Sequence, residues 1–147
     1  MSLNARAKGQ RGEREVVKLL QPVVDKVYQS HGVPAPALER NLMQSMKGGY
    51  DIVGLEWFAL EVKRHEKVSN SSTLQWWMQC KRQAAEGQDP VLFYRPNNIN
   101  WRIMMYGYVC VGPNGGPRVK TVVDIDLPAF LVWFELRMIH QLREVPK

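Results

Sequence analysis

The sequence has 147 residues, 45% of them apolar, which is typical of one globular domain with a single hydrophobic core. Twenty lysines and arginines against fourteen aspartates and glutamates give a formal charge of +6, which favours a polyanionic partner such as nucleic acid. No run of residues approaches the roughly 18 apolar residues that a membrane span needs. We therefore expect one domain over residues 1–147, with a cytoplasmic location and no membrane partner.

Apolar periodicity predicts a helix over residues 10–29, where Val16, Leu20, Val24 and Val27 recur at helical spacing. The other elements follow in chain order: strands over residues 38–44, 50–54 and 57–63, a helix over 73–86, strands over 91–95, 101–111 and 119–125, and a helix over 127–142 with Asp126 as its N-cap. This order predicts a mixed β-sheet flanked by helices, in the α/β class.

Cysteine and histidine usage excludes two kinds of site. Cys80 and Cys110 have no metal-ligand spacing and lie in apolar stretches, which predicts reduced packing residues rather than a disulfide. The three histidines, His31, His65 and His140, also lack the spacing of a zinc site. No zinc and no organic cofactor are expected.

The strand predicted over residues 57–63 carries charges inside an apolar run. Because side chains alternate along a strand, Glu61 and Lys63 share one face while Leu60 points to the other. An antiparallel turn centred near Glu56 would place Asp51 opposite Glu61, with Cβ atoms about 5 Å apart. Carboxylates so close repel each other unless a cation such as Mg²⁺ lies between them. The spacing predicts a metal site; the alternative is a solvated Glu61–Lys63 pair with Asp51 in a turn.

The first predicted helix contributes a third acid. Helical spacing places Glu13 within the apolar stripe, whereas Glu15 lies on the solvent face. A carboxylate on a buried face needs a cation or a hydrogen bond to compensate it. The alternative is that Glu13 stabilises the N-terminal end of the helix dipole.

Several of these segments resemble the PD-(D/E)XK nucleases, and within them the small Holliday-junction resolvases of archaea and their relatives in phages. The similar segments are "KGQRGERE" (residues 8–15), "ERNLMQSMKGGYDIVG" (39–54), "ALEVKRHE" (59–66) and "WWMQCKRQA" (76–84). Tyr50 stands where the signature has proline. The resemblance implies a restriction-endonuclease-like fold and hydrolysis of DNA phosphodiester bonds with Mg²⁺ or Mn²⁺.

The resemblance also implies roles for particular residues. Asp51 and Glu61, together with Val62, would bind the metal, Lys63 would be the catalytic lysine, and Glu13 would be the acid that resolvases carry on their first helix. Phosphodiester hydrolysis needs an activated water and neutralisation of the charge that gathers on the phosphate oxygens, and these residue types suit both tasks.

The helix predicted over residues 73–86 presents a polar row of Gln75, Gln79 and Arg82. By resemblance, Gln79 is expected near the scissile phosphate, with Gln75 as the second choice; a plain solvated face is the alternative. Trp76 and Trp77 are expected to be core or subunit-contact residues rather than base-stacking platforms.

Basic side chains concentrate in the segments that resemble the nuclease. The expected DNA contacts are Lys8, Arg11, Arg40, Lys47, Arg64, Lys67 and Arg82, with Gln75 beside them. Contacts to phosphates position a duplex without reading its sequence, which suits an enzyme that recognises branched shape.

These features predict a homodimeric, structure-specific endonuclease, because a four-way junction must be nicked on two opposed strands. Two alternatives stay open: a nuclease acting on other branched, nicked or linear DNA, and a catalytically silent nucleic-acid-binding module of the same fold.

Overall fold

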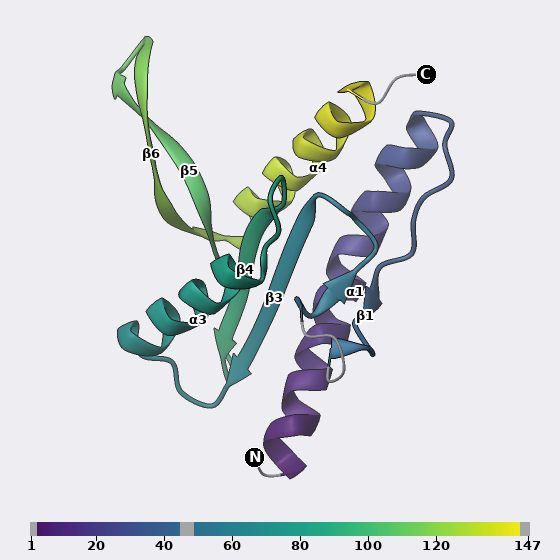
Figure 1. The fold of residues 1–147 in the computed structure, drawn as a ribbon, viewed down its shortest axis with the longest axis vertical. Coiled ribbons are helices and arrows are strands. Elements are labelled where there is room, and N and C mark those ends of the chain that lie inside the picture. Colours follow the sequence, from purple (N-terminus) through teal and green to yellow (C-terminus); the bar gives the residue numbers. More distant parts are fainter. Residues whose placement is uncertain (1–2, 45–48, 145–147) are drawn as a thin grey trace.

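The computed structural model describes residues 3–44 and 49–144, which form one six-stranded sheet with helices packed against it (Figure 1). The elements are α1 (Leu3–Ser30), β1 (Glu39–Arg40), β2 (Ile52–Val53), β3 (Phe58–His65), α3 (Asn70–Gln83), β4 (Asp89–Pro96), β5 (Arg102–Gly112), β6 (Gly115–Asp126) and α4 (Leu127–Glu144). The strands lie in chain order, and neighbouring strands are antiparallel except for the parallel pair β3 and β4. The predicted mixed α/β sheet flanked by helices is confirmed.

Helix α1 begins at Leu3 rather than at residue 10, and it ends at Ser30. Its buried stripe contains Val16, Leu20, Val24 and Val27, as the apolar period predicts. At Gly12 the helix passes close to β3, because a Cβ atom there would lie only 3.1 Å from the Cβ atom of Arg64. This crossing places the middle of α1 beside the C-terminal half of β3.

The strands predicted over residues 38–44 and 50–54 are shortened to two residues each, β1 and β2. Asn41 provides the reason, because its side-chain amide donates to the Tyr50 carbonyl at 2.9 Å and its side-chain oxygen accepts from the Met43 backbone N–H at 3.2 Å. Such local hydrogen bonds compete with a strand ladder. The predicted antiparallel register is confirmed, since Ile52 pairs with Leu60.

Helix α3 begins at Asn70 rather than at residue 73, and it ends at Gln83 rather than at residue 86. The early start follows from a capping box: Ser69 accepts from the Ser72 N–H, and the Ser72 hydroxyl accepts from the Ser69 N–H. Trp77 is the large side chain that α3 buries. The N-terminus of α3 is therefore set by two serines, and the pattern of apolar residues does not reveal it.

The last strands form a long hairpin that projects from the body of the protein (Figure 1). Only residues 102–105 of β5 pair with β4, so the outer part of the hairpin has no neighbouring strand other than its own partner. Cys110 lies in this outer part and is exposed, so its prediction as a packing residue is wrong. Asp126 ends the hairpin and caps α4, accepting from the Ala129 N–H at 2.9 Å as predicted.

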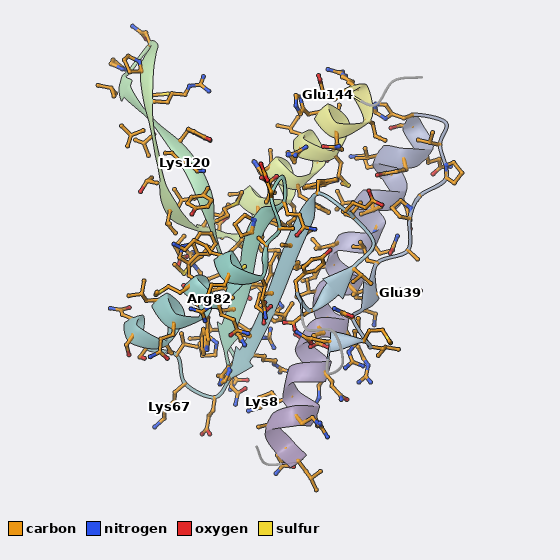
Figure 2. All side chains as sticks on the ribbon, viewed as in Figure 1. Lys8, Glu39, Lys67, Arg82, Lys120 and Glu144 are labelled. Atoms are coloured by element: carbon orange, nitrogen blue, oxygen red, sulfur yellow. The ribbon has the colours of Figure 1, made fainter. Side chains whose placement is uncertain are left out.

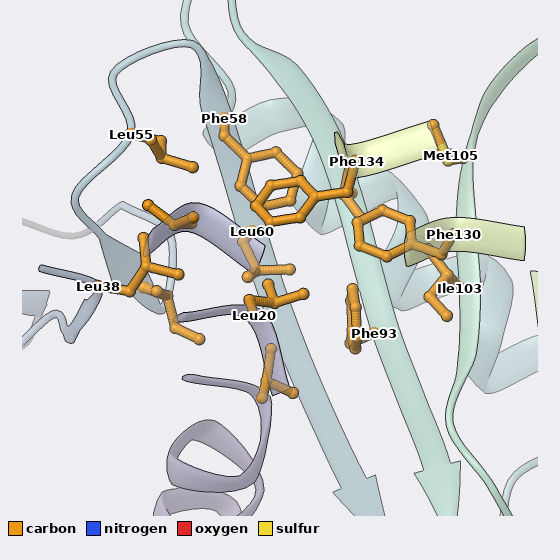
Figure 3. Close-up of a cluster of buried hydrophobic side chains, with 14 of the residues drawn as sticks. Leu20, Leu38, Leu55, Phe58, Leu60, Phe93, Ile103, Met105, Phe130 and Phe134 are labelled. Carbon is orange, nitrogen blue, oxygen red and sulfur yellow. The ribbon is translucent and has the colours of Figure 1, made fainter. Parts of the chain in front are cut away.

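The larger hydrophobic core lies between the sheet and the helices α1 and α4 (Figure 3). Phe58, Phe93, Phe130 and Phe134 meet at its centre, and the rings of Phe130 and Phe134 stack with centroids 5.7 Å apart. Burial of each such ring stabilises the fold by about 1.5–3 kcal/mol. Phe130, Phe134 and Met138 of the last helix are therefore core residues.

A smaller core on the other face of the sheet holds α3 in place. It consists of Trp77, Cys80 and Leu92, with Met104 and Tyr106 packed beside them. Cys80 is thus the buried packing residue that was predicted. No helix in the described part of the chain has the length and apolar character needed to cross a membrane.

Candidate active site

Asp51 and Glu61 lie side by side inside the protein. Within residues 3–44 and 49–144 they are the only charged or polar residues that are fully buried, with exposed fractions of 6% and 1%. The antiparallel pairing of Ile52 with Leu60 brings them together, as predicted. Burial, reinforced by the Asp51 charge, raises the pKa of Glu61 to about 8. Glu61 therefore retains its proton at neutral pH in the metal-free protein, and a bound cation would favour its ionised form.

Both oxygens of Asp51 are held by hydrogen-bond donors. Its Oδ1 accepts from the Gln44 side-chain amide at 2.7 Å, and its Oδ2 accepts from the Val62 backbone N–H at 2.8 Å. Glu61 Oε1 accepts from Gln79 Nε2 at 3.3 Å, so Gln79 reaches the acids from α3. Glu61 Oε2 is buried and has no hydrogen-bond partner among the described residues. This unpartnered oxygen is the atom most available to a bound cation.

Gln44 is a site residue that the sequence argument missed. Its amide also donates to the Gly49 carbonyl at 3.0 Å, so Gln44 contacts both the Gly49 backbone and the Asp51 carboxylate. The signal was present in the "ERNLMQ" segment, but an isolated glutamine in a stretch predicted as strand gives no reason to expect this contact.

Lys63 lies on the same face of β3 as Glu61, and its Nζ is 3.5 Å from Glu61 Oε1. The Glu61 carboxylate is 2% exposed and the Lys63 side chain is 21% exposed, so the lysine connects the buried acid to the surface. A cleft opens there, and it is lined by residues that include Lys8, Glu13, Arg40, Gln44, Asp51, Val62 and Lys63. Strand alternation therefore placed the lysine correctly.

Glu13 faces the same cleft from α1, and only 15% of its side chain is exposed. Burial raises its pKa, and the Asp51 charge adds to this effect, whereas the hydrogen bond from Arg40 opposes it. That bond joins Arg40 Nε to Glu13 Oε2 at 2.6 Å. Because α1 begins at Leu3, Glu13 lies well beyond the first turn. The helix-dipole interpretation is therefore wrong, and the inward orientation is confirmed.

Glu15 does not lie on a plain solvent face, contrary to prediction. Its carboxylate pairs with Arg64 Nη1 at 3.0 Å and with Arg95 Nη2 at 3.6 Å. The close crossing of α1 over β3 at Gly12 brings these charges together. The Arg64 side chain, a predicted phosphate contact, is 14% exposed and so offers little surface to DNA.

The other predicted DNA contacts lie near the cleft or on the surface. Lys8 lines the cleft, Arg11 is exposed on α1, and Arg82 and Gln75 are exposed on α3. Lys67 is exposed just after β3, and Figure 2 shows it at the same end of the molecule as Lys8. Lys47 lies outside the described residues.

The two tryptophans of α3 pack against the fold. Trp77 is 2% exposed, and its ring meets Tyr106 edge to face at 5.2 Å between centroids. Trp76 stacks on His65 at 4.7 Å between ring centroids. Burial lowers the pKa of His65, and the charges of Lys63 and Lys8 lower it further. His65 also lines the cleft.

The donor set fits a hard divalent cation. In the described part of the chain no group of three or more histidine, cysteine, aspartate or glutamate side chains is gathered around one point. Mg²⁺ does not require such a cage, since it retains several waters and is often held by one or two carboxylates. Asp51 and Glu61 provide those carboxylates, and the unpartnered Glu61 Oε2 is consistent with such a ligand.

Comparison with known proteins agrees with this arrangement. A family model described as "phage putative PDDEXK endonuclease" matches residues 4–110. Searches of curated proteins and of solved structures gave no match. The matched span runs from α1 into β5 and contains Glu13, Asp51, Glu61, Lys63 and Gln79. It covers well over half of the sequence, and the chain therefore belongs to the phage PDDEXK endonuclease family, with the restriction-endonuclease-like α/β fold of the PD-(D/E)XK superfamily.

Proposed function

We propose that this protein is a Mg²⁺- or Mn²⁺-dependent endonuclease that cuts branched DNA, with four-way junctions as its preferred substrate, and that it acts as a homodimer. Membership of an endonuclease family supports nuclease activity on DNA. The observation that carries the metal-dependent chemistry is the buried pair Asp51 and Glu61, with Lys63 Nζ 3.5 Å from Glu61 at the base of an open cleft.

Asp51 and Glu61 would hold the metal, with Val62, which lines the cleft and donates its backbone N–H to Asp51, as a further contact. A divalent cation bound there supplies Lewis-acid neutralisation of charge on the phosphate and on the leaving oxygen. Gln44 and the Val62 N–H fix the orientation of the Asp51 carboxylate. Gln79 holds Glu61 Oε1 from the side of α3. The acids are therefore oriented before substrate arrives, which is how preorganised sites lower a barrier.

Lys63 would orient the attacking water or stabilise negative charge on the phosphate. Its ammonium is held by Glu61 and faces the cleft, so it can reach a phosphate that enters there. Arg40 uses Nε to bind Glu13, and its guanidinium carries further donors that suit a phosphate. Glu13 thus orients Arg40 in the cleft, and we place it among the catalytic residues.

DNA would be held mainly by phosphate contacts around the cleft. The proposed contacts are Lys8, Arg11, Arg40, Lys47, Arg64, Lys67, Gln75 and Arg82. Lys8, Arg40 and Arg64 line the cleft itself, and Arg64 contributes least because only 14% of its side chain is exposed. Phosphate contacts carry no sequence information, so selection among DNA substrates would follow their shape.

Metal-dependent cleavage is the first test of this proposal. Junction and linear DNA are incubated with Mg²⁺ or Mn²⁺ and with either the native protein or the Asp51→Asn variant. The native protein should cut, and the variant should not, because one oxygen ligand becomes a neutral amide. DNA binding without cleavage by the native protein would identify a silent binding module instead.

Substrate shape is tested by competition. We expect a four-way junction to displace a labelled junction at least about 10-fold better than linear duplex of the same sequence, a difference of about 1.4 kcal/mol. Ca²⁺ replaces Mg²⁺ to suppress cutting, and the salt concentration is fixed because phosphate contacts make affinity salt-dependent. Equal competition by linear duplex would leave a general nuclease in place of a junction-specific one.

Replacement of Gln44 by leucine is expected to reduce cleavage about 10- to 100-fold, the usual effect of losing a residue that orients a metal ligand. The variant keeps Asp51 itself, so raising the metal concentration should restore part of the rate. Gln29→Leu, an exposed position at the far end of α1, is the matched control and should cut normally. A Gln44→Leu protein with native activity at limiting metal would contradict this role.

A further inference from the structure

Strand β6 leaves a long edge of the sheet unpaired. It is the last strand of the sheet, and over residues 115–126 its hydrogen-bonding partner in the described part of the chain is β5. Most of its residues are exposed, including Val119 at 56% and Val122 at 38%. An exposed apolar edge strand is a template for pairing with another strand.

The charges on β6 are arranged symmetrically about Val122. The stretch "RVKTVVDID" (residues 118–126) carries Arg118 and Lys120 on one side of Val122, and Asp124 and Asp126 on the other. Because side chains alternate along a strand, all four charges and Val122 share one face. The basic half of the strand is therefore complementary to its own acidic half when a second copy runs antiparallel to it.

We propose that β6 is the homodimer interface, and that it pairs antiparallel with β6 of a second copy about a two-fold axis at Val122. This register places Lys120 opposite the partner's Asp124, and Arg118 opposite the partner's Asp126. On the other face it places Val119 opposite the partner's Ile125. Opposite charges and apolar pairs facing each other across strands both stabilise a sheet. Moving the axis to Lys120 would instead bring two lysines face to face.

This interface deepens the proposed function, since it gives the dimer a definite geometry. Across the sheet, Glu61 of β3 pairs with Leu92 of β4, Leu92 pairs with Met104 of β5, and Met104 pairs with Asp124 of β6. Directly paired residues point to the same face of a sheet, so the charged face of β6 is the face that carries Glu61. A two-fold axis normal to the sheet keeps this face on the same side in both copies. The two active sites would thus open toward one side of a continuous sheet, where a single branched DNA can reach both.

Other contacts leave the outer edge of β6 accessible. Asp124 is bound by Arg102 from β5 and by the Tyr94 hydroxyl from β4, and Asp126 accepts from the Ala129 N–H. Lys120 lies over the Tyr106 ring at 4.2 Å. Figure 2 shows Lys120 on the projecting hairpin, away from Lys8 and Lys67 beside the cleft. Dimerisation through this edge therefore does not obstruct the active site.

Disulfide trapping tests the register without any measurement of cleavage. In a Cys110→Ser background, Val122→Cys should form an intermolecular disulfide, because residues at a two-fold axis of an antiparallel pair have Cα atoms about 4.5–5.5 Å apart. Val119→Cys is the matched control. It is more exposed than Val122, at 56% against 38%, but its counterpart in the second copy would lie about 20 Å away. Efficient trapping at Val122 with little at Val119 is expected. Equal trapping at both positions, or at neither, would overturn the register.

Charge reversal provides a second test by sedimentation. Native protein should be dimeric, and the Lys120→Glu and Asp124→Lys variants should each be monomeric, because each brings like charges together. A mixture of the two variants should form heterodimers. A monomeric native protein, or variants that dimerise alone, would reject the interface. Circular dichroism checks that both variants fold.

Cleavage by a monomeric native protein would refute this interface and leave the proposed nuclease chemistry intact.

Discussion

Replacing Lys63 with methionine is expected to reduce DNA cleavage about 100- to 1,000-fold, the usual effect of removing one charge-stabilising donor from an active site. Methionine retains the length of the side chain but removes the ammonium that lies 3.5 Å from Glu61 Oε1. The loss should appear mainly in the turnover rate, because the many phosphate contacts around the cleft still bind DNA. Single-turnover cleavage and binding in Ca²⁺ measure the two effects separately.

The fold should survive this substitution. The Lys63 charge opposes the upward shift of the Glu61 pKa, so without it Glu61 retains its proton more strongly and is buried as a neutral group. Lys26→Met is the matched control, since Lys26 pairs with Glu135 at the surface with 70% of its side chain exposed. Unfolding of Lys63→Met, or equal loss of cleavage in the control, would assign Lys63 a structural role.

The metal-free protein is expected to lose stability as the pH rises from about 5 to about 8. Burial raises the pKa of Glu61 from 4.5 to about 8, so the folded protein retains a proton that the unfolded chain has already released. Unfolding in this range releases that proton, and the free energy of unfolding falls by at most about 1.4 kcal/mol per pH unit. The decline should end above about pH 8, where Glu61 is ionised in both states.

Urea denaturation across this pH range measures the effect. Glu61→Gln should remove the decline, because glutamine cannot ionise, whereas Glu86→Gln at an exposed position should retain it.

Calorimetric titration with metal provides a second measurement of the Glu61 proton. Mg²⁺ or Mn²⁺ should bind more tightly as the pH rises toward about 8, because the metal must displace the Glu61 proton. Identical pH profiles for native protein and Glu61→Gln would show that Glu61 does not carry this proton.

Local periodicity was sufficient to predict much of the site. Alternation along β3 placed Glu61 and Lys63 on one face, and the antiparallel register brought Asp51 beside Glu61. The apolar stripe of α1 turned Glu13 inward. These features could be predicted because each follows from the spacing of residues within one element or one hairpin.

Element boundaries were predicted less well, because short-range hydrogen bonds override the apolar pattern. Asn41 replaces the strand ladder at the end of β1, and the Ser69–Ser72 capping box starts α3 early. Both effects depend on polar side chains whose choice of partner is not visible in a hydrophobic pattern.

Contacts between distant segments decided which partners the charged groups have. Arg40 neutralises Glu13, Gln44 orients Asp51, and Arg64 is held by Glu15. These contacts depend on where α1 crosses β3 and on where Gln44 lies relative to Asp51. Periodicity along the chain gives the direction of a side chain, but the group that it meets is set by the packing of whole elements, which no local spacing encodes.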